Sequence, residues 1–217
     1  MSKVTVHHLN NSRSTRVLWL LEELGIPYDI VQHKRGNDLL AQDDLKAVHP
    51  MGKAPVITVD GATIAESGAC IEYILARFGQ DSPLRVDPAS KEYADYIYWM
   101  HCAEGSVMST FILNMMLGRV ASSEVRKQIM DPRIKTALSH IEAQLARHDG
   151  KGLVKPGLTA ADIQMSTIYE TVESMGLLPS YPSIEAFYKS MHANPHYKEA
   201  ESKGGPVDFK AFLKAKS

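Results

Sequence analysis

Residues 4–31 read VTVHHLNNSRSTRVLWLLEELGIPYDIV, and this stretch decides the fold of the first part of the chain. Its first four residues alternate apolar and polar side chains, which predicts a short strand. After a polar break, apolar residues recur at helical spacing from Val17 to Leu24, and Gly25 suits the position after a helix end. A second apolar stretch begins at Tyr28. Strand, helix and strand form the unit that builds a parallel pair.

Two further features complete this region. Short apolar stretches flank Asp60-Gly61, a pair favoured in two-residue turns, and they predict an antiparallel hairpin. Apolar residues at helical spacing predict a helix that begins near Ser67 and ends at Gly79. Residues 1–80 are therefore expected to form a small α/β domain with a mixed sheet.

The pattern changes after residue 80. Residues 81–88 contain two prolines and two aspartates, which is typical of a linker. From residue 89 to residue 217 the periodicity is helical throughout, so an all-α second domain is expected there.

Two helix starts can be recognised in this second domain. Asp131 can cap a helix and Pro132 can occupy its first position, so a helix is expected to restart there. Thr159 and Asp162 have the spacing of a capping box, with apolar residues behind them, and predict another helix start.

The composition excludes several classes of function. The 217 residues carry 24 Lys and Arg against 25 Asp and Glu, whereas nucleic-acid binding needs a basic excess or a basic face. The longest uncharged run, residues 105–118, is shorter than the roughly 20 residues that span a bilayer. Cys70 and Cys102 form no disulfide framework, and the histidines show no metal-ligand spacing. We therefore expect a cytoplasmic protein with no metal, no nucleic acid and no membrane partner.

Ser12 lies between the first predicted strand and the first predicted helix. A serine here can simply cap the helix by accepting a hydrogen bond from a first-turn amide. The position also suits thiol activation, because helix-end amides stabilise anions and a hydroxyl donor stabilises a thiolate. Ser14, two residues later, is the competing candidate for that role. Arg13 and Arg16 are expected to be solvated side chains of a surface helix.

Glu66 and Ser67 precede the helix that follows the hairpin. Ser67 can act as the N-cap of that helix, or its hydroxyl and the helix-end amides can hold a carboxylate. Glu66 can pair with an ammonium group. The pair would then suit a ligand that carries an α-amino acid head.

The run at residues 105–118 is rich in methionine. Core packing is the ordinary explanation, but methionines also line adaptable apolar pockets. The candidates for such an acceptor pocket are Tyr98, Met108, Phe111 and Met115.

Four segments together resemble the glutathione transferases of bacteria and fungi. They are the strand and helix at 8–25, HPMGKAPV at 49–56, IAESGA at 64–69 and LTAADI at 158–163. They occur in the order and spacing of that family, and the resemblance covers nearly the whole chain. His49 and Ala54 stand where the family usually has Asn and Val, and neither change removes a catalytic atom.

The resemblance implies a thioredoxin-like N-terminal domain followed by a helical bundle. It implies a transferase that conjugates glutathione, as co-substrate, to small hydrophobic electrophiles. Ser12 would activate the thiol, since it stands four residues before Arg16 as in the serine-type classes. It also implies a homodimer, in which Glu104 would reach the γ-glutamyl amine bound by the partner subunit.

The resemblance also implies a set of glutathione-binding residues. Pro55 would be a cis-proline, and the backbone of Ala54 would pair with the cysteinyl part of the tripeptide. Glu66 and Ser67 would hold the γ-glutamyl group, and Lys53 would lie near the carboxylate at the other end.

Two other functions remain open on these residues. The same thiolate could attack an organic peroxide, which would make the protein a glutathione-dependent peroxidase. Alternatively the fold could bind glutathione or another ligand without turnover, because a fold does not fix a function.

Overall fold

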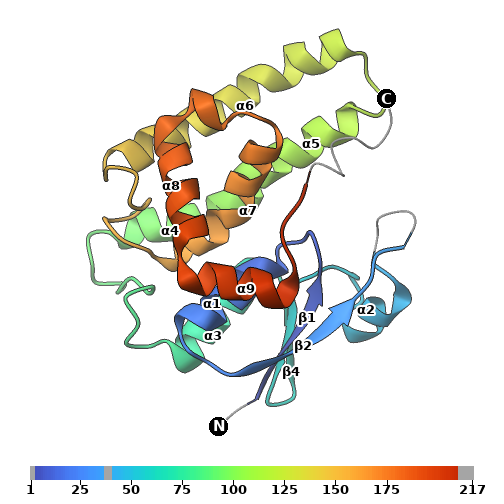
Figure 1. Ribbon diagram of the computed structural model, residues 1–217, viewed down its shortest axis with the longest axis vertical. Coiled ribbons are helices and arrows are strands. Elements are labelled where there is room, and N and C mark those ends of the chain that lie inside the picture. Colours follow the sequence, from blue (N-terminus) through green and yellow to red (C-terminus); the bar gives the residue numbers. More distant parts are fainter. Residues whose placement is uncertain (1–2, 37–40, 210–217) are drawn as a thin grey trace. The chain divides into compact units, whose positions relative to one another are not determined.

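The computed structural model describes residues 3–36 and 41–209 of the 217-residue chain, and the chain forms two compact units (Figure 1). The first unit contains the chain up to Arg85 together with residues 191–207, and the second contains residues 86–190. The boundary after Arg85 lies within the expected linker at 81–88. The structure groups residues 191–207 with the first unit, whereas the sequence pattern assigned them to the helical domain.

The first unit has a mixed sheet, as the sequence predicted, and helices lie on both faces of it. Its elements are β1 (Val4–Leu9), α1 (Ser14–Glu23), β2 (Tyr28–His33), α2 (Asp43–Val48), β3 (Val56–Val59), β4 (Ala62–Ala65), α3 (Ser67–Phe78) and α9 (Pro195–Gly204). The strand order is β2-β1-β3-β4, with β1 and β2 parallel and the other pairs antiparallel. The predicted strand-helix-strand unit and the predicted hairpin are both confirmed.

Neighbouring histidines of β1 identify the two faces of the sheet, because successive side chains of a strand point to opposite sides. His8 bonds to Ser14 of α1, so it faces that helix. His7 contacts His33 of β2, which in turn bonds to Asp44 of α2. The sheet therefore lies between α1 on one face and α2 on the other.

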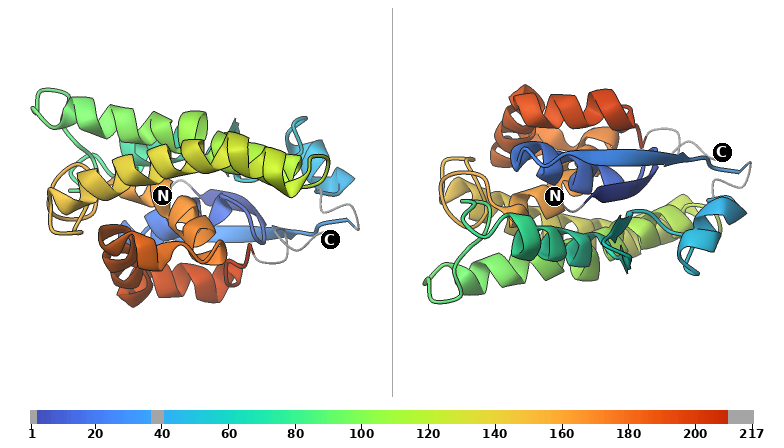
Figure 2. Two further views of the ribbon diagram at one scale, coloured as in Figure 1. Left: turned by 90° about the horizontal axis from the view of Figure 1, so that it is seen from above. Right: turned by 90° about the horizontal axis from the view of Figure 1, so that it is seen from below.

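Helix α9 packs against α1 although 172 or more residues separate them in sequence (Figures 1 and 2). The Tyr197 ring meets the Trp19 indole edge-on, with the ring centroids 5.1 Å apart. Asn194, the N-cap of α9, donates from Nδ2 to Glu23 at 2.7 Å. Buried aromatic pairs of this kind bury large apolar areas, which explains why α9 belongs with the first unit.

The second unit is helical. It contains α4 (Tyr93–Cys102), a π-helical segment (Ala103–Met108), α5 (Ser109–Leu117), α6 (Ser123–Ala146), α7 (Ala160–Ser174), a 3-10 turn (Leu178–Ser180) and most of α8 (Pro182–Ala193). Every residue of α7 from Ala160 to Val172 is buried, so α7 is its central helix. The predicted capping box of Thr159 and Asp162 is confirmed at the start of α7.

The expected helix restart at Asp131 and Pro132 is wrong, because α6 runs through both residues. Proline lacks the amide that would bond to the carbonyl four residues earlier. Near this proline, Arg133 donates from its guanidinium to Ile129 O at 2.5 Å and Thr136 donates to Pro132 O at 2.8 Å, but neither acceptor is Gln128 O, the carbonyl four residues before Pro132.

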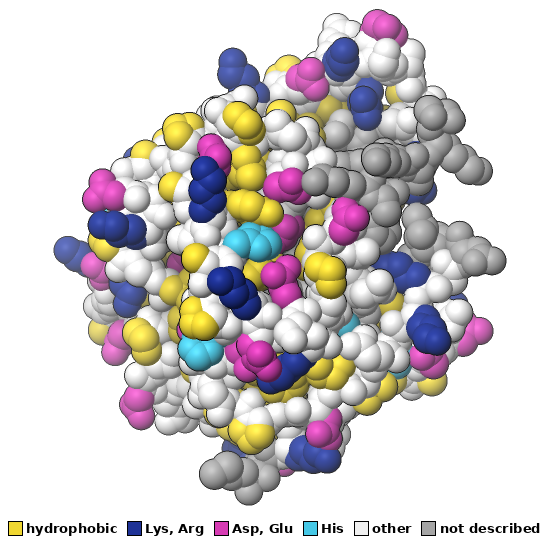
Figure 3. Space-filling view, in the orientation of Figure 1, with side chains coloured by type: hydrophobic (Ala, Val, Ile, Leu, Met, Phe, Trp, Pro, Cys, Tyr) yellow, Lys and Arg dark blue, Asp and Glu magenta, His cyan; other side chains and the backbone are white. Residues whose placement is uncertain are grey.

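None of the helices found in residues 3–36 and 41–209 is both long enough and apolar enough to cross a bilayer. On the face drawn in Figure 3, Lys and Arg side chains stand beside Asp and Glu side chains, and the described residues there form no continuous basic patch. This mixture agrees with the near-zero net charge of the chain.

Candidate functional site

The predicted site residues of the first unit share one end of its sheet. The end of β1 pairs with the start of β3, and the start of β3 also pairs with the end of β4. The loop after β1, the segment before β3 and the residues after β4 therefore lie at the same end. They carry Ser12, Ala54-Pro55 and Glu66-Ser67. Helices α1 and α3 both begin here, and helix N-termini favour anions.

Ser12 lies in the loop before α1, one residue ahead of the N-cap residue, Arg13. Its hydroxyl donates to the Leu9 carbonyl at 2.6 Å or to Ser14 Oγ, which is 2.7 Å away. Its oxygen also accepts from the Ser14 amide at 3.2 Å. Ser12 therefore satisfies a first-turn amide, as a cap would, while its hydroxyl proton has two alternative acceptors in the loop.

The competing residue, Ser14, is the first residue of α1 and is completely buried. Ser12 keeps 8% of its surface exposed. Ser14 Oγ lies 2.8 Å from His8 Nδ1 and accepts from the Leu9 amide at 3.4 Å. Ser14 is therefore more deeply buried than Ser12, which favours Ser12 of the two candidates.

The segment before β3 has the predicted backbone geometry. The Ala54-Pro55 peptide bond is cis, and Pro55 is buried while Ala54 is half-buried. Lys53 is exposed. The implied cis-proline is confirmed.

Glu66 and Ser67 lie where β4 turns into α3. The structure makes Glu66 the N-cap and Ser67 the first helical residue, so the expectation that Ser67 is the N-cap is wrong. Glu66 is exposed and has a φ of 71°, in the left-handed region that non-glycine residues seldom adopt. Such strained residues often mark ligand contacts.

Arg16 of α1 was expected to be solvated, and this expectation is wrong because its side chain is 0% exposed. Its NH1 group donates to Ser67 Oγ at 2.9 Å. A buried guanidinium is costly unless it is paired, and one beside a helix N-terminus adds positive charge where an anion would bind.

The second unit carries the remaining candidates. Met108 and Phe111 are buried, Met115 is half-buried, and Glu104 is half-buried in the π-helical segment. Tyr98 is 48% exposed, and its hydroxyl lies 3.0 Å from His140.

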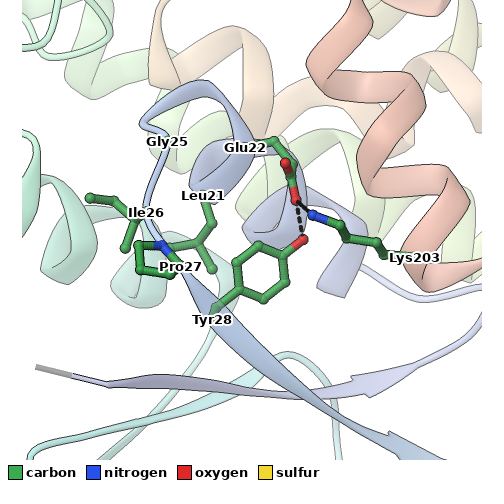
Figure 4. A pocket seen from close by; sticks show the side chains of 7 residues that line it. All are labelled: Leu21, Glu22, Gly25, Ile26, Pro27, Tyr28 and Lys203. Carbon is green, nitrogen blue, oxygen red and sulfur yellow. Dashed lines mark hydrogen bonds and ion pairs between the residues drawn. The ribbon is translucent and has the colours of Figure 1, made fainter.

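A shallow pocket of about 410 Å³ lies at the other end of α1 (Figure 4). It is lined by Leu21, Glu22, Gly25, Ile26, Pro27, Tyr28 and Lys203. Glu22 accepts from both the Tyr28 hydroxyl and the Lys203 ammonium, so the polar side chains of the pocket already have partners within the protein. It includes none of the predicted site residues.

Two residues that contact the predicted site were not predicted as part of it from the sequence. His8 bonds to Ser14, and Arg16 bonds to Ser67. A histidine in a strand and an arginine in a helix are usually exposed side chains, and only the folded structure shows that these two are buried. The adjacent SRSTR pattern at 12–16 is the one local signal that could have drawn attention to Arg16.

Burial lowers the pKa of His8, and burial together with the nearby His33 lowers the pKa of His7. Because each folded pKa lies below the unfolded value of about 6.5, the unfolded chain binds more protons between the two values. The first unit should therefore lose stability as pH falls through 6.5. We expect urea unfolding to give a lower free energy of unfolding at pH 5.5 than at pH 7.5, by at most about 1.4 kcal/mol per unit of pKa shift. In His7→Asn the fall in unfolding free energy between these pH values should be smaller than in the wild-type protein. An equal fall in both proteins would contradict the assignment of this pH dependence to His7.

Comparison with known proteins gives two family matches. Residues 12–77 match the model of the glutathione S-transferase N-terminal domain, and residues 111–202 match the model of the glutathione S-transferase C-terminal domain. Glutathione S-transferase 1 of Saccharomyces cerevisiae is 29% identical, over 92% of this chain and 94% of its own length.

Solved structures agree with these matches. A glutathione S-transferase from Actinobacillus pleuropneumoniae superposes with a TM-score of 0.87 and is 27% identical, covering 99% of this chain and 97% of its own. A glutathione transferase homologue from Lodderomyces elongisporus, solved with two glutathione molecules per subunit, has a TM-score of 0.78 at 15% identity. That alignment covers 94% of this chain and 99% of the other, and at this identity it supports the fold alone.

Proposed function

Because the chain belongs to the glutathione S-transferase family, we propose that it conjugates glutathione, through a thiolate held at Ser12, to small hydrophobic electrophiles. The observation that carries the proposal is the position of Ser12. Ser12, with 8% of the residue exposed, stands at the N-terminal end of α1, at the same sheet end as the cis-proline and the start of α3. A hydroxyl donor and helix-end amides both favour the thiolate over the thiol.

The tripeptide would lie across this end of the sheet. The backbone of Ala54, before cis-Pro55, would pair with the cysteinyl unit. Glu66 would receive the α-ammonium group, and Ser67 with the first amides of α3 would receive the α-carboxylate. Exposed Lys53 would lie near the glycine carboxylate.

The acceptor site and the assembly are part of the same proposal. Tyr98, Met108, Phe111 and Met115 would line the electrophile site. A cytoplasmic homodimer would place Glu104 near the partner's γ-glutamyl group. Cys70 and Cys102 are buried free thiols, which agrees with a reducing compartment.

The test is a titration of the thiol of bound glutathione, followed by thiolate absorbance against pH. Wild-type protein should lower the thiol pKa below its free value, and Ser12→Ala should return it by about one unit, the effect of one lost hydrogen bond to the anion. An unchanged thiol pKa with wild-type protein would show that no activation occurs. Equal lowering by both proteins would transfer the role from Ser12 to the helix N-terminus.

An acceptor panel then separates transferase from peroxidase activity. Electrophiles such as activated aryl halides should be turned over in preference to organic hydroperoxides. The opposite preference would favour the peroxidase, which uses the same thiolate.

A further inference from the structure

Three short contacts connect Ser12 to the interior of the first unit. Ser12 Oγ lies 2.7 Å from Ser14 Oγ, and Ser14 Oγ lies 2.8 Å from His8 Nδ1. His8 Nε2 lies 2.8 Å from the Gly204 carbonyl at the end of α9. Ser14 and His8 are both 0% exposed, so this series of hydrogen bonds meets the proposed glutathione site only at Ser12.

The chemistry of the groups fixes the direction of these bonds. A carbonyl can only accept, so His8 Nε2 carries a proton and donates it to Gly204. Burial lowers the pKa of His8, which keeps the ring neutral and leaves Nδ1 as an acceptor for the Ser14 hydroxyl. Ser14 Oγ can then accept the Ser12 proton.

With a neutral His8, this hydrogen-bonded network holds fewer side-chain protons than its contacts can use. Ser12, Ser14 and His8 supply three protons for five contacts, because Leu9 O lies 2.6 Å from Ser12 Oγ and 3.2 Å from Ser14 Oγ. The Ser12 proton can serve only one of its two acceptors at a time. The network therefore has room for one additional proton.

We propose that Ser14 and His8 relay the thiol proton of bound glutathione away from Ser12, with His8 Nδ1 as the final acceptor. The inference rests on the proposed function. The S–H bond breaks and its proton bonds to Ser12 Oγ, while the Ser12 proton passes to Ser14 Oγ and the Ser14 proton passes to His8 Nδ1. The sulfur keeps the electron pair. The products are a thiolate, two neutral serines and an imidazolium, and the Ser12 hydroxyl now donates to the sulfur.

The surroundings of His8 make it a temporary acceptor. Desolvation disfavours the imidazolium, and the Gly204 carbonyl favours it. The charged groups of the packed helices are engaged elsewhere: Arg16 of α1 bonds to Ser67, and Lys203 of α9 pairs with Glu22 and Glu199. Gln32, opposite His8 on β2, is neutral. The imidazolium is thus supported mainly by the thiolate, and its proton returns through Ser12 to water once the thioether leaves.

Gly204 is required for this arrangement. A Cβ there would lie 2.6 Å from Leu18 Cδ1 and 2.8 Å from His8 Cε1, closer than carbon atoms approach without a shift. Gly204 therefore lets α9 come close enough to hold the His8 ring. His8 touches no substrate atom, so it is a positioning and proton-accepting residue that acts through two serines.

The test measures two quantities on glutathione binding, the pH at which thiolate forms and the number of protons released to solvent. In wild-type protein, thiolate should form with less than one proton released per thiolate. His8→Asn keeps an amide oxygen near the Nδ1 position but cannot take a proton. It should therefore move thiolate formation upward by about one pH unit and release a full proton. His7→Asn, on the same strand but the opposite face, should behave as wild type.

The outcomes separate the two proposals. If wild-type protein does not lower the thiol pKa, the proposed function fails. If wild type and Ser12→Ala behave as proposed but His8→Asn titrates and releases protons as wild type does, only the relay is wrong. Ser14→Ala keeps the His8 ring but removes the hydroxyl that connects it to Ser12, so it should reproduce the His8→Asn result. A wild-type response from Ser14→Ala would likewise overturn the relay.

Discussion

Asp162→Ala should lower the free energy of unfolding of the helical unit by about 3 kcal/mol, because it removes the acceptor for several buried donors at once. Asp162 is completely buried. Its Oδ1 accepts from the Leu153 amide at 2.8 Å, and its Oδ2 accepts from the Thr159 amide at 2.8 Å and the Thr159 hydroxyl at 2.7 Å. Alanine would leave two backbone amides buried without partners, and each such group costs about 1–3 kcal/mol.

Urea unfolding at pH 7.5 measures this effect. Burial raises the pKa of Asp162 to about 6 despite its hydrogen bonds, so the carboxylate is ionised at the assay pH. Ser122→Ala is the matched control, since Ser122 caps α6 through a single bond to the Val125 amide in an exposed setting. That loss should be about 1 kcal/mol. If Asp162→Ala lowers the free energy of unfolding by no more than Ser122→Ala does, the buried hydrogen bonds of Asp162 contribute no more than an ordinary helix cap.

Local sequence signals were sufficient for several elements of both units. The turn pair Asp60-Gly61, the alternation in β1 and the capping box before α7 each depend on residues within a few positions of one another. The structure confirms all three. The cis-proline before β3 came from the family resemblance rather than from a local rule, because only about 5–6% of X–Pro bonds in folded proteins are cis.

Local signals failed where a distant residue or a side chain decided the outcome. The restart at Pro132 assumed that a proline ends a helix, whereas α6 continues through Pro132 although the proline lacks an amide for the carbonyl four residues earlier. The burial of His8 depends on Gly204, which is 196 positions away. No periodicity within β1 could indicate that α9 would cover this face.

Arg16→Met should weaken glutathione binding by about 100-fold while leaving the fold intact, because it removes a buried positive charge from the anion site. The Arg16 guanidinium donates to Ser67 Oγ at 2.9 Å, so its charge lies at the start of α3, where the ligand carboxylate is proposed to bind. At an effective dielectric near 20, a charge a few ångströms from a carboxylate contributes roughly 3 kcal/mol, and each 1.4 kcal/mol is tenfold in Kd. Methionine fills a similar volume without a charge to bury, so folding should be little affected.

Calorimetric titration with glutathione measures the change in Kd, and thermal unfolding of the free protein checks the fold. The control is Arg77→Met on α3, whose exposed guanidinium pairs with Asp60 on the surface and should not affect binding. Ser67→Ala should weaken binding by less than Arg16→Met, since the charge remains in place. If Arg16→Met binds glutathione as tightly as wild type, the buried charge serves packing alone and the anion is held by Ser67 and the α3 amides without it.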